Sequence, residues 1–405
     1  MVVAKQHFKA KRYSAKNGQA SLCFWMELSM KKYLNLVAGL CAVSSVWADV
    51  DVSAGVKLYG VLDQAVQSQT LKDSISATAG QKYVGMYAAA ATSRVGVKAT
   101  RDINGDTKAY IQVELEVKPD KPKGGVINTS ANRGTFVGLD GKAGTIRLGT
   151  QETMAYETFA MDANGRTEYK PQLWRLTQTK GDSNSQGDRA GNSVKYITPV
   201  VGGLTGHALA GLGEGNTRYQ SVAIKYQDDK FKGVFIRDIT ENAKGKLCAP
   251  GTNCTDGVAY DGSTTGNSNS LVWGGTNDDK VFRNVAAASY DFGLMNLNYI
   301  YAKAYTTVYS KTGSLTTHTL GLKIPLDSLT LALSLGTGTL DSYTTASATN
   351  LTAGDAKLSD TTLGAYYAFD KSTSAYFVGS LTSIGNQSVQ AGSVKTANLG
   401  LQYKF

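Results

Sequence analysis

Charged side chains at alternating positions are the feature of this sequence best able to do chemistry. In the segment 57–63, Lys57 and Asp63 are at odd-numbered positions, and Leu58 and Leu62 are at even-numbered positions. Successive side chains of a β-strand point to opposite faces, so such a segment has one charged and one apolar face. A wall of such charges can attract and orient ions and polar solutes. Alternation assigns these residues to the charged face: Lys57, Tyr59, Asp63, Arg94, Lys98, Glu114, Arg133 and Arg147.

The apolar face of each segment supports this assignment. If such segments cross a membrane, an Arg or Lys that faces lipid near the midplane costs about 2–4 kcal/mol. The orientation that turns the charged face towards lipid is therefore disfavoured. On the segment 133–140 the rule places Phe136 on the lipid face and Arg133 on the charged face.

Catalytic and metal-binding chemistry have little support. Beyond residue 48 the histidines are His207 and His318, both in strand-like segments and neither near a nucleophile motif. A hydrolytic enzyme needs a Ser/His/acid set or an acid–His pair. We therefore expect no catalytic residues, no cofactor and no metal site.

The first 48 residues have the pattern of an export leader. Lys31 and Lys32 follow Met30, residues 34–46 are apolar or small, and Ala48 precedes Asp49 as a small cleavage-site residue. This is the three-part pattern of a secretory signal peptide over 30–48. Residues 1–29 are interpreted as an over-called start or an upstream extension, which leaves 49–405 as the mature chain.

The basic character of the chain resides mostly in this leader. The whole sequence has 42 Lys and Arg against 32 Asp and Glu. Removing residues 1–48 leaves 35 basic and 31 acidic residues, a net charge of +4. Because no dense basic patch remains, nucleic-acid binding is not expected.

The mature chain is predicted to be all-β. Its hydrophobic periodicity is two, as in 328–336, where leucine alternates with small or polar residues. No stretch after residue 48 is long and apolar enough for a membrane-spanning helix. Sixteen such segments can be counted, near 54–67, 92–101, 107–117, 133–140, 143–150, 191–198, 204–213, 220–227, 230–238, 282–290, 294–304, 316–324, 328–337, 361–369, 373–383 and 395–405.

The connections alternate between tight turns and long loops. Turns such as 102–106 and 228–229 are rich in Gly, Asn and Asp. The alternative fold, a soluble sandwich or solenoid, does not require short turns at one end and long loops at the other. A closed barrel inserted into a membrane from one side does require this arrangement. Closure also lets every backbone N–H and C=O group of the sheet find a partner within the bilayer. All six prolines (119, 122, 171, 199, 250 and 325) are expected in loops or turns.

The pattern resembles the trimeric general-diffusion porins of Gram-negative outer membranes, closest to the β-proteobacterial type. The order and spacing of several short motifs carry the resemblance over about residues 50–405. They are Val56-Lys-Leu-Tyr-Gly-Val-Leu-Asp63, Ser93-Arg-Val-Gly-Val-Lys98, Asn132-Arg-Gly-Thr-Phe-Val-Gly-Leu139, Thr145-Ile-Arg-Leu-Gly149, Asn192-Ser-Val-Lys-Tyr196 and Leu399-Gly-Leu-Gln-Tyr-Lys-Phe405.

The resemblance implies a transmembrane 16-stranded antiparallel β-barrel with short periplasmic turns, long external loops and a third loop, 151–190, folded inward. The loop carries Glu157 and Asp162, and the resemblance sets Arg94, Arg133 and Arg189 on the opposing wall of a constriction. Such opposed charges would orient polar solutes and bias which ion enters. Thr150 stands where the family commonly has arginine, and the fourth external loop, 214–219, looks short.

The resemblance also implies partners. Tyr403 and Phe405 would form the carboxyl-terminal signal read by the barrel-insertion machinery. The protein would be a homotrimer in the outer membrane, in contact with its lipid and lipopolysaccharide, and would pass small hydrophilic solutes. The assigned bases outnumber the assigned acids on the wall, so a weak anion preference is expected. The alternative function is an outer-membrane adhesin or structural barrel that binds through loops such as 239–281.

Cys248 and Cys254 are predicted to form a disulfide, since the exported chain would meet an oxidising compartment. A zinc half-site is the alternative, although no further His or Cys lies nearby in the sequence. So short a loop constrains the unfolded chain little, so the bond should barely alter barrel stability. Alkylation of the unreduced protein followed by mass spectrometry should show both thiols protected. Alkylation of both would contradict the pairing.

Overall fold

The structure is a computed structural model. It describes residues 49–53, 55–73, 82–87, 89–119, 127–165, 173–177, 188–212, 218–241, 280–308, 311–341, 356–385 and 392–405. The predicted leader 1–48, the Cys248–Cys254 pair and residues 242–279 of the loop proposed for adhesion lie outside these residues.

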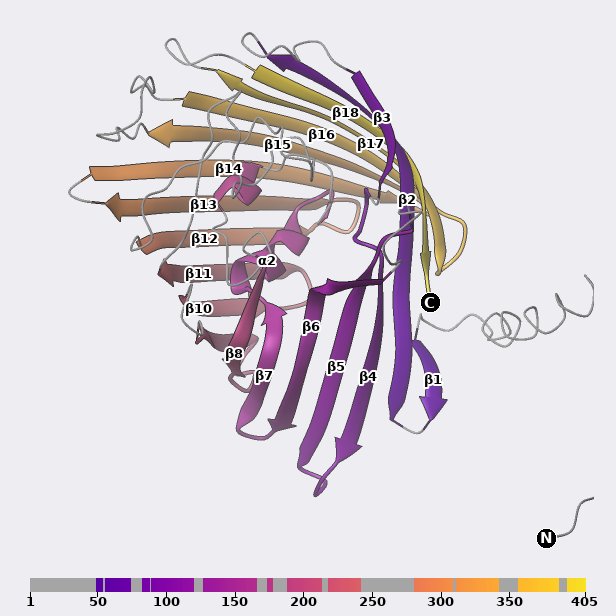
Figure 1. The fold of residues 1–405 in the computed structure, drawn as a ribbon, viewed down its shortest axis with the longest axis vertical. Helices are drawn as coiled ribbons and strands as arrows, with labels where there is room; N and C mark the ends of the chain where they lie inside the picture. The colour runs from indigo at the N-terminus through magenta and orange to yellow at the C-terminus, as the bar shows by residue number, and fades with distance from the viewer. Residues whose placement is uncertain are drawn as a thin grey trace, which may run out of the picture. The chain divides into compact units, whose positions relative to one another are not determined.

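The described residues form eighteen β-strands and three short helical segments (Figure 1). The strands are β1 (Asp49–Ser53), β2 (Val56–Asp73), β3 (Lys82–Tyr87), β4 (Arg94–Asp102), β5 (Thr107–Val117), β6 (Ile127–Gly141), β7 (Gly144–Glu152), β8 (Arg189–Ile197), β9 (Leu204–Gly211), β10 (Arg218–Gln227), β11 (Phe231–Glu241), β12 (Lys280–Asp291), β13 (Asn296–Val308), β14 (Lys311–Leu326), β15 (Leu329–Asp341), β16 (Ala356–Ala368), β17 (Thr373–Gly385) and β18 (Gly392–Lys404). The helical segments are α2 (Met154–Thr158), η1 (Phe159–Met161) and η2 (Leu173–Thr177).

These strands close into an antiparallel barrel with sixteen strand positions. β18 pairs with β2 from Gly392↔Asp73 to Lys404↔Val61, which joins the last strand to the first long one. Two positions are each filled by two segments. β1 pairs with β2 below the end of β18, and β3 and β4 pair with successive parts of β2 on its other edge.

The predicted fold is confirmed, with differences in the number and ends of the strands and in the place of one proline. Each of the sixteen predicted segments overlaps one strand, but β1 and β3 were not expected and β2 extends well into the predicted loop 68–91. Pro325 lies within β14, opposite Thr330, rather than in the turn that follows. Proline is tolerated close to the end of a strand because few ladder bonds remain there to be lost.

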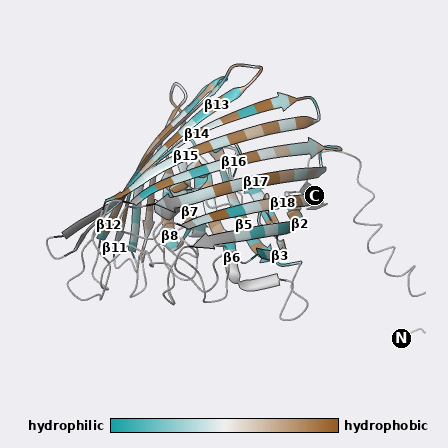
Figure 2. Cartoon of the chain, turned by 90° about the horizontal axis from the view of Figure 1, so that it is seen from above, coloured by the Kyte–Doolittle hydropathy of each residue, from teal (hydrophilic) through white to brown (hydrophobic). Residues whose placement is uncertain are grey.

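The alternation of side chains separates the two faces of the wall. On β15, Leu331 and Leu335 are 39% and 44% exposed, whereas Ala332 and Ser334 are buried. Figure 2 shows hydrophobic and hydrophilic residues alternating along β13 to β17. Leucine therefore faces lipid, and small or polar residues face the interior. Among the described residues no helix is long and apolar enough to span a membrane.

The short turns are built around aspartate. Asp228 accepts hydrogen bonds from the backbone N–H groups of Lys230 and Phe231, and Asp370 accepts them from Ser372 and Thr373. These N–H groups hold the pKa of both carboxyls below the usual value, because they stabilise the charged form. Asp at such positions favours a tight turn, as predicted from composition.

The barrel closes at its carboxyl-terminal residue. The backbone N–H of Gly60 donates to the carbonyl of Phe405 at 2.8 Å, and that of Phe405 donates back to Gly60 at 3.1 Å. A Cβ atom at residue 60 would collide with the Phe405 ring and would lie 2.8 Å from the carbonyl oxygen of Arg94. Glycine is required here because the ring lies over the backbone of the first long strand.

Gly60→Ala should therefore weaken barrel closure. We expect a loss of about 1–3 kcal/mol, the typical cost of overpacking, measured as a lower urea midpoint for loss of the folded band in semi-native electrophoresis. Gly385→Ala is the matched control, because a Cβ there meets nothing within 4 Å. Equal midpoints for both variants would contradict the role assigned to Gly60.

Candidate functional site

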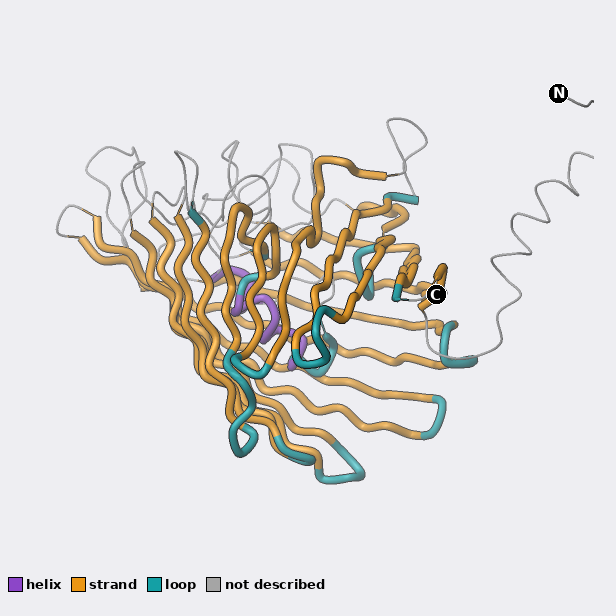
Figure 3. The backbone as a smooth tube through the Cα atoms, turned by 90° about the horizontal axis from the view of Figure 1, so that it is seen from below, coloured by secondary structure: helices purple, strands orange, loops and turns teal. Residues whose placement is uncertain are grey.

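The segment between β7 and β8 lies inside the barrel. Its helix α2 contacts β10 and β11, and η2 contacts β13, β14, β15 and β16. Figure 3 shows the helical segments surrounded by the strands. Thr153 begins α2, and its hydroxyl accepts a hydrogen bond from the N–H of Tyr156 at 3.4 Å. The inward-folded third loop predicted for 151–190 is confirmed for the part that the structure describes.

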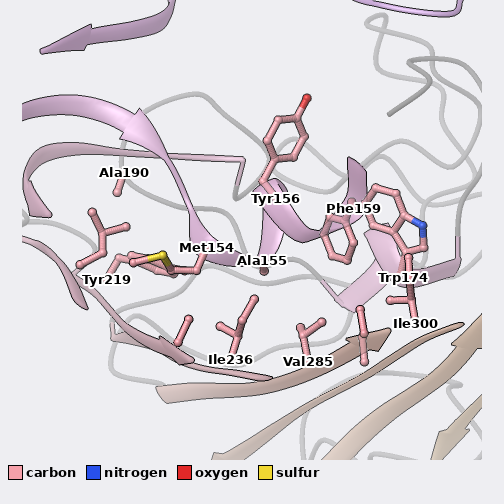
Figure 4. Packing of buried hydrophobic residues seen from close by; sticks show 14 residues of the cluster. Met154, Ala155, Tyr156, Phe159, Trp174, Ala190, Tyr219, Ile236, Val285 and Ile300 are labelled. Carbon is pink, nitrogen blue, oxygen red and sulfur yellow. The ribbon is translucent and has the colours of Figure 1, made fainter. Parts of the chain in front are cut away.

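Apolar side chains fix this loop to the inner wall (Figure 4). Met154, Phe159 and Trp174 are fully buried, and the two rings stack with centroids 3.4 Å apart. They pack in one cluster with Ile236 and Ile300 of the wall. Apolar residues on the inner face of a water-filled barrel would be unfavourable if uncovered, so the loop accounts for their presence.

Asp162 holds the end of the helical segment to β15. Its carboxylate accepts hydrogen bonds from the indole N–H of Trp174 at 3.1 Å and from the Ser334 hydroxyl at 2.8 Å. Asn164 also donates to Ser334, at 2.8 Å. Asp162 is 2% exposed, so its carboxylate attaches the loop to the wall.

Glu157 attaches α2 to the barrel wall at β8 and β10. It forms ion pairs with Lys195 of β8 and Lys225 of β10, the second at 2.7 Å. Burial raises the pKa of Glu157, but the charges and hydrogen bonds of the two lysines outweigh it and lower that pKa to about 2. The carboxylate therefore stays charged throughout the physiological range.

Arginines and carboxylates gather on the wall formed by β4 to β8. Glu114 pairs with Arg133 at 3.0 Å and with Arg94 at 3.7 Å. Arg189 donates to the carbonyl oxygen of Arg133, lies 3.5 Å from Glu152, and its guanidinium is 5.2 Å from the centroid of the Tyr156 ring on α2. Tyr59 donates to Glu114 at 2.9 Å. This charged cluster lies beside the loop.

The predicted orientation of Phe136 towards lipid is wrong, because β6 contains a β-bulge. Phe136 pairs with Gln112, and its ring lies 5.2 Å from the guanidinium of Arg147, so it faces the interior and not lipid. The register then shifts between Gly134 and Asn132. The extra residue in the bulge lets Arg133 point inward as well, where it reaches Glu114.

Two further bases rest on aromatic rings. Arg147 donates to the Tyr110 hydroxyl at 2.7 Å and lies over the Phe136 ring. The Lys98 ammonium is 4.1 Å from the centroid of the Tyr59 ring. Lys57 is opposite Lys98 in the register of β2 and β4. These contacts position the cations without neutralising them.

Asp63 lies apart from these groups, at the seam between β18 and β2. Its carboxylate accepts hydrogen bonds from Tyr376 at 2.7 Å, from Gln402 at 2.9 Å and from the N–H groups of Ala89 and Ala90. The side chain is fully buried. Asp63 thus fixes the segment between β3 and β4 against the closing seam.

The structure brings together some of the predicted site residues and separates others. One cluster contains Tyr59, Arg94, Glu114, Arg133 and Arg189. Three other predicted residues each hold a segment of the chain in place, namely Asp63, Glu157 and Asp162. Tyr403 is 45% exposed on the outer face, and its ring stacks with that of Phe405. Lys225, Ser334 and Trp174 were missed, although Lys225 and Ser334 fall on the inward parity of strand-like segments.

These observations define the class of protein as a transmembrane antiparallel β-barrel with a loop folded into its interior. The profile of the family described as Gram-negative porin matches residues 36–387, and the chain belongs to that family. It is a protein of the Gram-negative outer membrane.

A relative of similar sequence is also named as an outer-membrane porin. Outer membrane porin protein 32 of Delftia acidovorans is 29% identical over 215 residues, which are 51% of this chain. The match spans 56% of the relative, or a little over half of its length.

Solved structures show the same fold. The anion-selective porin from Comamonas acidovorans superposes with a TM-score of 0.65 at 19% identity, over 86% of this chain and 99% of that one. A loop L8 deletion mutant of OmpT from Vibrio cholerae gives 0.63 at 16% identity, over 87% of this chain and 100% of that one. OmpF from Salmonella typhi gives 0.55 at 14% identity, over 88% and 100%.

Glu157→Gln should loosen the internal loop. The variant leaves Lys195 and Lys225 close together without a shared carboxylate, so we expect severalfold more frequent transient current fluctuations in single-channel records. Because the folded pKa is lowered, the wild-type anchor is complete above pH 4.5 and is lost as the pH falls towards 2. Wild-type fluctuations should therefore rise over that window.

Glu116→Gln is the matched control, since the ion pair of Glu116 is with Lys118 on the wall and not with the described part of the loop. If the Glu157 variant is as quiet as this control at neutral pH, Glu157 does not anchor the loop.

Proposed function

We propose that the protein forms a water-filled channel for passive diffusion of small hydrophilic solutes and ions across the outer membrane. The interior of the described wall carries charged and polar residues, and the third loop narrows it. Passage through such a channel depends on solute size and charge. No catalytic step is proposed, in keeping with the channel-forming family to which the chain belongs.

An excess of base on the inner wall favours weak anion selectivity, and this observation carries the finer part of the proposal. Lys195 and Lys225 share the single carboxylate of Glu157. Arg147 and Lys98 contact aromatic rings, and Arg94 and Arg133 share Glu114. A lumen with more cations than carboxylates lowers the electrostatic barrier for anions. The solved structure from Comamonas acidovorans is named an anion-selective porin.

The charge arrangement differs from a simple pair of opposed walls. Glu157 and Asp162 bind the wall that the loop covers, so the arginine cluster meets its carboxylates, Glu114 and Glu152, on neighbouring segments. We infer that Arg94, whose side chain is 28% exposed, lines the passage on this side, and that Arg133 and Arg189, which are 9% and 6% exposed, support it from within the same cluster. Lys57, Lys98 and Arg147 would act nearer the periplasmic mouth, because they lie closer to the short turns.

A homotrimer is the assembly we propose. One of the similar solved structures, OmpT of Vibrio cholerae, is described as a trimer form and superposes with a TM-score of 0.58. Analytical ultracentrifugation of the detergent-solubilised protein, corrected for bound detergent, tests the proposal.

If the basic residues of the inner wall favour anions, removing them should reduce the preference of the channel for chloride. In a salt gradient across a planar bilayer, the wild-type reversal potential should show chloride preferred over potassium. Lys98→Gln combined with Arg147→Gln should shift it towards potassium by about two- to threefold in permeability ratio without abolishing conductance.

Lys357→Gln serves as the control, because Lys357 faces outward, opposite Thr339 of β15. A wild-type channel that prefers potassium severalfold would overturn the proposed anion preference.

A further inference from the structure

Three adjacent strands carry a polar group on the lipid-facing side of the barrel. Arg237 of β11 is opposite Asn284 of β12, which is opposite Lys303 of β13. Their neighbours in sequence, such as Ile236 and Ala302, are fully buried on the inner side. Alternation therefore directs these three side chains outward. We refer to Arg237, Asn284 and Lys303 as the outer basic patch.

The guanidinium of Arg237 is held in a fixed orientation. It donates to the Asn284 amide oxygen at 2.9 Å and to the Tyr305 hydroxyl at 3.0 Å, and it lies 5.5 Å from the centroid of the Phe282 ring. Phe282 and Tyr305 stack with centroids 5.2 Å apart. Within the described part of the chain, the contacts of Arg237 are all with neutral groups.

The neighbouring charges do not neutralise the patch. Lys280 pairs with Glu241 at 2.7 Å, four residues nearer the external loops along β11 and β12. Lys303 forms no ion pair within the described residues. Adjacent strands are about 4.8 Å apart, so Arg237 and Lys303 are separated by roughly 10 Å of wall, a distance that their long side chains can bridge around one anion.

The patch lies at the upper edge of the apolar belt. On β14 and β15 the outward residues are leucine or isoleucine up to Leu320 and Leu335, and the next outward positions are His318 and Thr337. Strands rise about 3.3 Å per residue and tilt by about 35–45°, so eight residues span roughly 20 Å of membrane. Arg237 and Lys303 lie six and seven residues above the periplasmic ends of their strands.

Apolar side chains lie beside and below the patch. Val222 of β10 is opposite Arg237, and the Ile224–Phe235 pair lies two residues nearer the periplasmic end. All three side chains are between 54% and 62% exposed on the outer face. An amphiphile with its anionic group on Arg237 and Lys303 would therefore place its hydrocarbon chains along these residues.

We propose that the outer basic patch binds a phosphate group of lipid A, the anchor of lipopolysaccharide in the outer leaflet of this membrane. Arg237 supplies a preoriented fork of N–H donors, Lys303 supplies a second positive charge, and the apolar strip below accepts acyl chains. Arg237 has no ion-pair partner among the described residues, and a fixed arginine at this depth is costly in lipid unless an anion accompanies it, so the bound phosphate also stabilises the barrel wall.

Native mass spectrometry of the full-length protein in detergent tests this directly. Diphosphoryl lipid A is titrated into wild type, into Arg237→Gln/Lys303→Gln and into Lys357→Gln/Lys395→Gln. The last variant removes the same charge from outward lysines of β16 and β18. We expect roughly tenfold weaker binding for the first variant alone, the effect of losing two charge-assisted contacts at an exposed site.

Two further arms complete the test. Dephosphorylated lipid A should bind wild type as weakly as the patch variant binds diphosphoryl lipid A, and phosphatidylglycerol should bind more weakly than lipid A. Equal binding of lipid A by the patch and control variants would overturn the proposal, as would unchanged binding after phosphate removal. If the double variant does not fold, Lys303→Gln alone should weaken binding about threefold. Conductance provides an independent check, because these outward residues should leave it unchanged.

Discussion

The structure depends on one constraint: within hydrocarbon, every backbone N–H and C=O group must find a partner in the chain itself. A sheet satisfies this only when its first and last strands pair. Here β18 pairs with β2 along thirteen successive registers, and the terminal Phe405 exchanges hydrogen bonds with Gly60. The double filling of two positions, by β1 with β18 and by β3 with β4, follows from the same need to leave no edge unpaired.

Closure creates an interior that the chain then partly fills. The inner wall of β10 to β13 carries Ile236, Val285 and Ile300, which would face water in an empty barrel. The third loop covers them with Met154, Phe159 and Trp174, and it is attached to the wall by Glu157 within α2 and by Asp162 just after η1. The position of the loop thus rests on burial of apolar surface together with satisfied polar contacts, so the narrowing is built into the resting fold.

Much of this could be predicted from the sequence, because the two-residue period is read directly from residues such as Leu331 and Leu335. The facing of Arg94, Glu114 and Arg147 follows from the same rule. Phe136 was assigned wrongly because a bulge shifts parity, and nothing in the local sequence around Gly134 announces it. β1 and β3 are too short to show a period. The anchoring partners of Asp162, Trp174 and Ser334, are set by tertiary packing between segments far apart in sequence, which periodicity does not report.

A cross-link between the third loop and β15 measures where the loop lies. Asp162→Cys and Ser334→Cys replace groups whose side chains are joined by a 2.8 Å hydrogen bond. If the loop lies against the wall, mild oxidation should join the two cysteines, seen as a cross-linked peptide by mass spectrometry, while single-channel conductance stays unchanged. Free thiols after oxidation, or a conductance that changes severalfold when the bond forms, would contradict a loop held against the wall in the open channel.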